Sequence, residues 1–233
     1  MGCSAALGVA VARALDPYAK TDAIVDRAMA WERVFHGNPS GIDAAVAASG
    51  GSVLFEKGRG LEPVRLRGSV LLCIGSTGLG SSTKTMVEAV AKRRAKSPVI
   101  VDKTFEAIRA LVRNARLALE AGDRATLGRL MDLNQMLLGG LFLSTPEIES
   151  LCSLARSAGA YGAKLTGAGG GGSVVALVPS TAVAEAVLTA WATAGFHGFA
   201  TRVAGGGAGD GVPASTGART EEREHSMPGE AAQ

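Results

Sequence analysis

The amino-acid sequence predicts an α+β fold, and three observations lead to this class. Apolar residues make up 47% of the 233 residues and charged residues 19%, as is typical of a globular protein with a buried core. Helical and strand-like segments are mixed without strict alternation. Over residues 163–203 the predicted order is strand, glycine-rich loop, strand, helix and strand, which fits part of a ferredoxin-like sheet.

The first 50 residues predict three helices. An Ala-, Val- and Leu-rich run at 5–15 indicates a buried helix, which Asp16-Pro17 ends. A second helix is expected from Thr21 or Asp22, with one apolar stripe. That stripe consists of Ile24, Ala28, Trp31 and Phe35. After a loop rich in Gly and Pro, residues 42–48 predict a short third helix, which Gly50-Gly51 ends.

The remaining elements follow from apolar runs and their punctuation. Strands are expected at 52–55, 63–66 and 70–74. Four helices are expected next, at 83–96, 102–121, 123–138 and 146–158, and Pro98 is expected to break the chain between the first two. Strands at 163–166 and 173–178, a helix at 181–194 and a strand at 199–203 complete the fold. Residues 205–233 show no periodicity, so we expect a disordered tail.

Composition argues against several classes of partner. The net charge is only +3, aromatics are 4% of residues, and no dense Lys/Arg block is present, so we expect no nucleic-acid partner. No run of about 18 uncharged apolar residues occurs, so no membrane partner is expected. The three cysteines are odd in number and their spacing matches no metal site, which favours a reduced, cytoplasmic protein.

Gly2, Cys3, Ser4 and Ala5 form the first candidate site, because small residues lead directly into a predicted helix. Backbone N–H groups at a helix N-terminus can point at a phosphate, and the helix dipole favours the negative charge. The Ser4 hydroxyl could also coordinate Mg²⁺. The alternative is an ordinary N-cap serine.

The second candidate combines Glu32 with the segment His-Gly-Asn-Pro-Ser-Gly-Ile-Asp at 36–43. Glu32 and His36 lie four residues apart and share a helix face. Asp43 begins the next helix, so two carboxylates could reach one small volume, one holding a metal and one facing a substrate hydroxyl. We expect Glu32 to face a solvent-filled cleft. The alternative is a turn whose Asp and Ser only cap a helix.

The third candidate is the segment Lys-Leu-Thr-Gly-Ala-Gly-Gly-Gly-Gly at 164–172. Four consecutive glycines between two strands are costly in chain entropy, so we expect that a ligand must approach this backbone closely. A structural reading, in which the loop is a packing device, remains open. The segment is no Walker loop, because no Gly-Lys-Ser/Thr follows. It also fits no dinucleotide fingerprint, because no acidic residue follows at a strand end about 20 residues later. Glu185 is near that spacing.

Together and in this order, the three segments resemble the GHMP kinases, and most closely the mevalonate kinase family. The segment 36–43 matches that family's signature, Glu32 matches a glutamate eleven residues before its aspartate, and 164–172 matches the glycine loop of the superfamily. Met-Asp-Leu-Asn-Gln at 131–135 is similar to an Asp-x-Asn-Gln helix of the family. The resemblance runs from Gly2 to about Val203.

The resemblance implies a role for each candidate residue. Ser4 and Glu32 would ligate Mg²⁺, and Asp43 would be the catalytic aspartate that orients or deprotonates the attacking hydroxyl. The nucleotide, ATP, would be bound by two groups of residues. These are Gly2, Cys3, Ser4 and Ala5 at the helix start, and Gly167, Ala168, Gly169 and Gly170 in the glycine loop. The expected substrate is mevalonate, and the family also suggests a homodimer.

The resemblance further implies a GHMP kinase fold in three parts. Residues 1–67 would be a partial N-terminal domain, 68–204 a ferredoxin-like C-terminal domain, and 205–233 the tail. Cys3 stands where the family usually has serine, and the family's Pro-x-Gly-x-Gly lead-in is absent. We therefore expect a fragment or a misplaced start. Alternatives are another GHMP kinase, acting on phosphomevalonate or a sugar, and a non-catalytic remnant.

Overall fold

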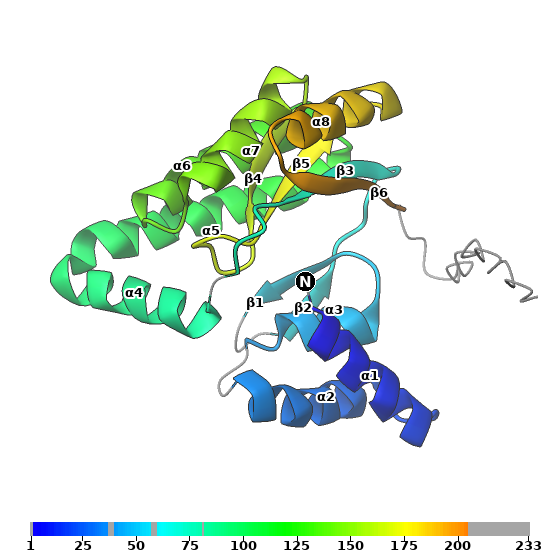
Figure 1. The fold of residues 1–233 in the computed structure, drawn as a ribbon. Coiled ribbons are helices and arrows are strands. Elements are labelled where there is room, and N and C mark those ends of the chain that lie inside the picture. Colours follow the sequence, from blue (N-terminus) through cyan, green and yellow to red (C-terminus); the bar gives the residue numbers. More distant parts are fainter. Residues whose placement is uncertain (1, 37–39, 57–59, 81, 205–233) are drawn as a thin grey trace, which may run out of the picture.

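The computed structural model describes residues 2–36, 40–56, 60–80 and 82–204 (Figure 1). The expected tail at 205–233 lies outside these residues. The helices are α1 (Cys3–Leu15), α2 (Thr21–His36), α3 (Ile42–Ser49), α4 (Thr83–Lys96), α5 (Pro98–Ala121), α6 (Arg124–Gly140), α7 (Pro146–Ser157) and α8 (Thr181–Thr193). The strands are β1 (Val53–Glu56), β2 (Gly60–Pro63), β3 (Val70–Ser76), β4 (Gly162–Thr166), β5 (Ser173–Val178) and β6 (His197–Val203).

Four strands form an antiparallel sheet in the order β4-β5-β3-β6. Along the chain these strands occur as β3, β4, β5 and β6, with α4–α7 between the first two and α8 between the last two. This is the ferredoxin-like arrangement that the sequence predicts, and the α+β class is confirmed. Ser76 pairs with Ser173, and Thr166 pairs with the same Ser173. The loop between β4 and β5 therefore lies at the end of the sheet where β3 ends.

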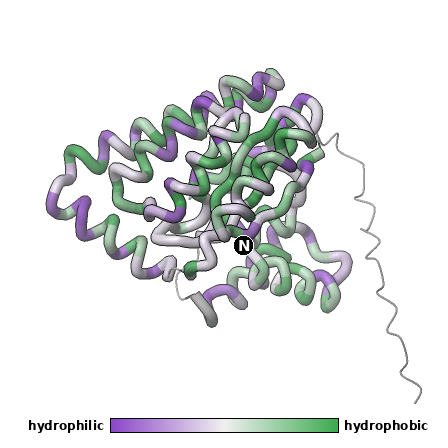
Figure 2. Tube along the Cα trace, turned by 45° about the horizontal axis from the view of Figure 1, so that its top comes forward, coloured by the Kyte–Doolittle hydropathy of each residue, from purple (hydrophilic) through white to green (hydrophobic). Residues whose placement is uncertain are grey.

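Helices cover both faces of this sheet, because its central strands are apolar on both sides. Cys73, Val174 and Ala176 pack with residues of α7 and α8 in the largest buried cluster, which includes Trp191. Val70 and Leu177 face the opposite way and pack with Ala118 of α5 and Leu127 of α6. The colouring by hydropathy in Figure 2 follows this pattern, with apolar segments gathered between the layers.

Trp191 explains two glycines in the strands. Its indole N–H donates to the carbonyl oxygen of Leu151 at 2.9 Å, and the side chain is fully buried. A Cβ atom on Gly75 or Gly198 would lie 2.9 or 2.7 Å from the indole ring. These strand glycines therefore leave room for a large side chain, as is usual where another group approaches a strand closely.

The first three helices form a separate small cluster, in which small side chains allow close packing. Its buried residues are Ala5, Val9, Ala12, Ile24, Ala28, Ala44 and Ala48. The second helix presents Ile24 and Ala28 inwards as expected, whereas Trp31 remains 36% exposed. The first helix was expected to be buried but is amphipathic, since Leu7, Val11 and Leu15 are exposed. Its buried face consists of Ala5, Gly8, Val9 and Ala12.

Two predicted boundaries are wrong. The expected break between α4 and α5 is found, but α5 begins at Pro98 itself and not at 102, because proline is well suited to the first helical position, where its missing N–H would have no partner. Strand β2 occupies 60–63 and not 63–66, since Glu56 pairs with Gly60 and Val53 with Pro63. The apolar pattern located the hairpin, but strand pairing set its register.

No helix within the described residues is long and apolar enough to span a membrane.

Candidate functional site

The start of α1 has the geometry of an anion-binding helix N-terminus. Gly2 is the N-cap residue and adopts a left-handed conformation, with φ of 63°. No side chain caps the helix, although the backbone N–H of Ala6 donates to the Gly2 carbonyl at 2.9 Å. The N–H groups of the first turn have no partner within a helix, because no helical carbonyl lies one turn before them. They and the helix dipole can therefore interact with a negative charge.

Ser4 and Glu32 are brought into direct contact although 28 residues separate them. The Ser4 hydroxyl donates a hydrogen bond to Oε1 of Glu32, which joins the first turn of α1 to α2. Glu32 is only 6% exposed, so the expectation that it faces a solvent-filled cleft is wrong. The packing of α2 against α1 buries this carboxylate and sets it beside the helix N-terminus.

Ser4 and Glu32 could serve as ligands of a magnesium ion, but they do not form a metal site that is enclosed by protein ligands. Within the described residues no group of three or more His, Cys, Asp or Glu side chains is arranged to hold a metal. Mg²⁺ does not need such a cage, because it usually keeps several waters and takes one or two protein oxygens together with substrate phosphates. A hydroxyl and a carboxylate in contact provide such a donor pair.

Asp43 approaches the same point from the third helix. It is exposed and lies in the first turn of α3, after Gly41 with φ of 87°. A Cβ atom placed on Gly2 would lie 3.9 Å from Oδ1 of Asp43, so this carboxylate faces the start of α1. Residues 37–39, which precede α3 in the matching motif, lie outside the described residues. The α1 cluster, defined as Gly2, Ser4, Glu32 and Asp43, thus joins three chain segments.

The glycine loop, residues 167–172, is fixed by neighbouring backbone. The N–H of Gly170 donates to the Leu143 carbonyl at 2.7 Å, and the N–H of Gly172 donates to the Leu79 carbonyl at 2.8 Å. A Cβ on Gly169 would overlap the Leu143 carbonyl oxygen, and one on Gly171 would lie 2.9 Å from that of Leu79. Part of the glycine content therefore serves close packing against protein.

The beginning of the loop differs from its middle. Gly167 has φ of 89°, is exposed, and a Cβ there would meet nothing within 4 Å. This open position, together with Ala168, is the part of the predicted loop that a ligand can approach. Figure 1 shows the β4–β5 loop and the start of α1 on the sides of the two helix–sheet groups that face each other.

Sequence reasoning missed the residues that hold the glycine loop. Thr77 follows β3, is 9% exposed, and its hydroxyl donates to the Gly172 carbonyl at 3.1 Å. The backbone N–H of Thr77 bonds the same carbonyl at 2.9 Å. A signal was present, since a Thr between a buried strand and a glycine often forms local backbone bonds. Gln135 belongs to the segment 131–135 that resembles a family helix, but this resemblance did not indicate its contact with the strand before the loop, and Leu143 gave no local signal.

Burial controls the titration of three groups in and below the sheet. It raises the pKa of Cys73 to about 11 and that of Cys152 to about 12, so neither thiol ionises near neutral pH. It lowers the pKa of Lys164, whose ammonium donates to the Leu165 carbonyl at 2.5 Å. Cys3, in contrast, is exposed in the first turn of α1.

Two surface pockets of about 410 and 480 Å³ lie elsewhere. None of the predicted site residues lines either pocket. The candidate site, at the start of α1 and in the glycine loop, is therefore separate from both pockets.

Comparison with known proteins shows that the chain is similar to small-molecule kinases over most of its length. Residues 107–198 match the family model described as GHMP kinases C terminal. The chain is 38% identical over 212 residues to a mevalonate kinase of Pyrococcus horikoshii, covering 87% of this chain and 62% of that protein. A mevalonate kinase of Aeropyrum pernix is 38% identical over 185 residues, covering 76% of this chain and 56% of that protein.

A solved structure agrees in fold over most of the chain. L. major mevalonate kinase in complex with R-mevalonate superimposes with a TM-score of 0.78 at 33% identity, covering 82% of this chain and 61% of that structure. The chain thus spans about three-fifths of the length of the proteins that it matches.

Proposed function

We propose, from the premise that this chain is a homologue of mevalonate kinases with a GHMP kinase fold, that its protein phosphorylates mevalonate with ATP to give 5-phosphomevalonate. The single observation that carries the proposal is the convergence of Ser4, Glu32 and Asp43, from three helices, at the N-terminus of α1. Phosphoryl transfer depends mainly on positioning and electrostatic stabilisation, and this cluster supplies both kinds of group.

Each residue then has a defined task. The first-turn N–H groups of α1 and the open start of the glycine loop bind phosphate oxygens. The Ser4 hydroxyl and the Glu32 carboxylate would hold Mg²⁺, which when bound neutralises charge on the phosphates. The Asp43 carboxylate orients the acceptor hydroxyl and takes its proton as the new P–O bond forms and the bond between the γ-phosphorus of ATP and its bridging oxygen breaks, with ADP as the leaving group.

Asp43 is well suited to this task because it is exposed and yet faces the start of α1. Glu32 is nearly buried and engaged with Ser4, which suits a ligand that must stay in place. The two carboxylates thus occupy different environments, and different environments allow two acidic groups to serve different roles.

The test is a coupled assay of ADP release by the purified protein with ATP and Mg²⁺. Mevalonate, phosphomevalonate, galactose and homoserine are supplied separately as acceptors. We expect ADP release that depends on mevalonate and on Mg²⁺. Release with another acceptor alone would replace mevalonate in the proposal, and binding of ATP without turnover on any acceptor would favour a non-catalytic protein.

The homodimer remains a prediction from the resemblance. Light scattering coupled to size exclusion would give the molar mass in solution, and about twice the chain mass of 23.5 kDa is expected.

A further inference from the structure

Strand β4 lies at the edge of the sheet, and side chains of helix α6 accept hydrogen bonds from its outward-facing backbone N–H groups. Among the described strands only β5 pairs with β4, and the N–H groups of Ala163 and Leu165 point away from the sheet, towards α6. Ala163 N–H donates to Oδ1 of Asp132 at 2.9 Å, and Leu165 N–H donates to Oε1 of Gln135 at 2.8 Å. Ala163 and Leu165 are two residues apart on the strand and present their N–H groups on one edge. Asp132 and Gln135 are three residues apart on the helix and lie on one face, so each can meet one of these groups.

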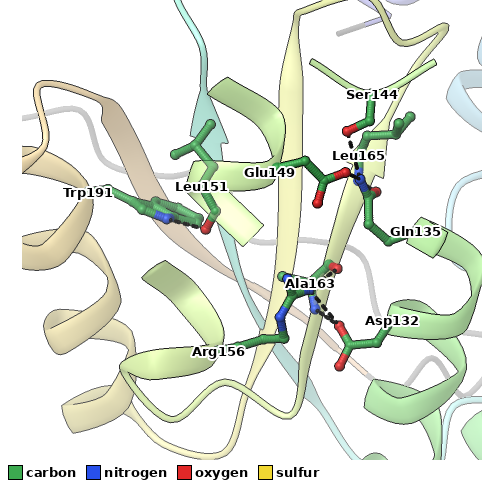
Figure 3. Close-up of polar contacts among 9 residues, drawn as sticks. All are labelled: Asp132, Gln135, Ser144, Glu149, Leu151, Arg156, Ala163, Leu165 and Trp191. Atoms are coloured by element: carbon green, nitrogen blue, oxygen red, sulfur yellow. Dashed lines mark hydrogen bonds and ion pairs between the residues drawn. The ribbon is translucent and has the colours of Figure 1, made fainter. Parts of the chain in front are cut away.

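Gln135 does more than close this edge. It is 3% exposed, and its side-chain N–H₂ donates to Oγ of Ser144 at 3.0 Å and to Oε1 of Glu149 at 2.9 Å. Figure 3 shows the amide between these partners, with Leu165 on its other side. One buried amide therefore joins α6, β4, the turn before α7, and α7 itself. Loss of either partner would leave a buried polar group unsatisfied.

Two of these segments lead directly to the glycine loop. Leu165 lies two residues before Gly167, where the loop begins. Leu143 is the neighbour of Ser144, and its carbonyl accepts the N–H of Gly170 at 2.7 Å. Gln135 thus holds the loop at its start through β4 and in its middle through the turn at 143–144.

Asp132 provides an internal comparison on the same helix. Its carboxylate accepts from Ala163 N–H and forms an ion pair with Arg156 at 3.1 Å. These contacts lie at the far end of β4 from the loop, since Gly162 begins the strand and Thr166 ends it. Asp132 therefore anchors the strand, whereas Gln135 anchors the loop.

We propose that Gln135 is a positioning residue for the glycine loop, so that nucleotide affinity depends on a buried amide that does not touch the nucleotide. The effect on affinity rests on the proposed function, but the effect on the loop does not. A hydrogen-bonded buried network of this kind can fix a single backbone arrangement when every member is satisfied.

The test uses a charge swap. Gln135→Glu keeps an acceptor for Leu165 but removes both donors and sets a carboxylate beside Glu149. The double variant Gln135→Glu/Glu149→Gln restores a donor–acceptor pair with the two side chains exchanged. Ser144→Ala removes one contact without adding a charge, and it keeps the test valid if Gln135→Glu folds poorly. Glu185→Gln, an exposed carboxylate on α8 away from this network, is the matched control.

Two readouts separate positioning from general stability. Hydrogen exchange of the 166–172 amides is measured without ligand, and the dissociation constant of ATP with Mg²⁺ is measured by calorimetry. We expect about tenfold faster exchange and about tenfold weaker ATP binding in Gln135→Glu, smaller changes in Ser144→Ala, and recovery of both in the swap. The turnover number at saturating ATP should change less than the affinity, and the control should match the unmodified protein.

Unchanged exchange and unchanged affinity in Gln135→Glu and Ser144→Ala would overturn the proposal. So would a swap that recovers the melting temperature but not the exchange of the loop. If exchange responds as expected while the unmodified protein binds no ATP, the positioning of the loop is supported and the proposed kinase function fails.

Discussion

The α1 cluster and the glycine loop are both built around small residues, but these residues serve different purposes in the two places. In the helices that carry the α1 cluster, alanines such as Ala5, Ala28 and Ala44 let α1, α2 and α3 approach closely, and the polar side chains proposed to act lie near the ends of these helices. In the loop, glycines let backbone meet backbone, as where Gly169 lies against the Leu143 carbonyl. Substitution of the polar side chains in the α1 cluster should therefore change activity more than stability. Substitution in the glycine loop should change both, because the same residues pack against protein and would contact the ligand.

The largest effect on activity is expected at Asp43, where activity and stability should respond most differently. Asp43→Ala should lower the turnover number by at least about 10²-fold, the usual scale for a group that orients or accepts a proton. Because Asp43 is exposed, the melting temperature should stay close to that of the unmodified protein. Steady-state kinetics and a thermal melt check both statements. A variant with more than a tenth of the original turnover would remove Asp43 from the catalytic role.

A pair of glycine substitutions tests the other side of the comparison. Gly169→Ala should destabilise the protein by about 2–5 kcal/mol, because the overlap of its Cβ with the Leu143 carbonyl costs about 1–3 kcal/mol and its positive φ adds about 1–2 kcal/mol. Gly167→Ala has open space and carries only the cost of a left-handed conformation, about 1–2 kcal/mol. Urea unfolding gives the two values. Equal stabilities would mean that packing does not constrain the middle of the loop.

Glu32→Gln should weaken the metal site while leaving the helix contact in place. Glutamine keeps an oxygen that can accept from Ser4, but it removes the negative charge that favours Mg²⁺. The Mg²⁺ concentration for half-maximal rate should rise several-fold. A normal Mg²⁺ titration together with a clearly lower melting temperature would instead identify Glu32 as a structural residue.

The smallest effect concerns thiol chemistry at the start of α1. Cys3 is exposed, whereas Cys73 and Cys152 are buried with raised pKa values, so one of the three thiols should react with a thiol reagent in the native protein. ATP with Mg²⁺ should slow that reaction, because Cys3 lies in the helical turn that we propose binds phosphate. Rapid labelling of all three thiols would contradict the buried environments. Labelling indifferent to ATP would contradict a phosphate site at α1.

The sequence predicted most of the fold because its elements carry local signals. The helix end at 121 and the helix start at 146 were predicted, and the structure places Gly122 directly after α5 and Pro146 in the first turn of α7. Where local signals conflicted with pairing or position, the prediction was wrong, as for the register of β2 and for Pro98 at the start of α5.

The candidate site was predictable in part for the same reason. Motifs pointed to Ser4, Glu32 and Asp43, and the structure brings these residues together, although their roles remain predictions. The burial of Glu32 was not predictable, since it depends on how α2 packs on α1. The role of Gln135 and Thr77 as supports of the glycine loop was also not predicted, because their bonds to Leu165 and Gly172 join residues 30 and 95 positions apart.

The central claim is that two regions of different construction bind one nucleotide. Hydrogen exchange with and without ATP and Mg²⁺ tests it most directly, with amides at 3–6 and at 167–172 followed in the same experiment. The account predicts that ATP slows exchange in both segments together, at the same nucleotide concentration. Protection of one segment alone, or of neither, would contradict a shared site.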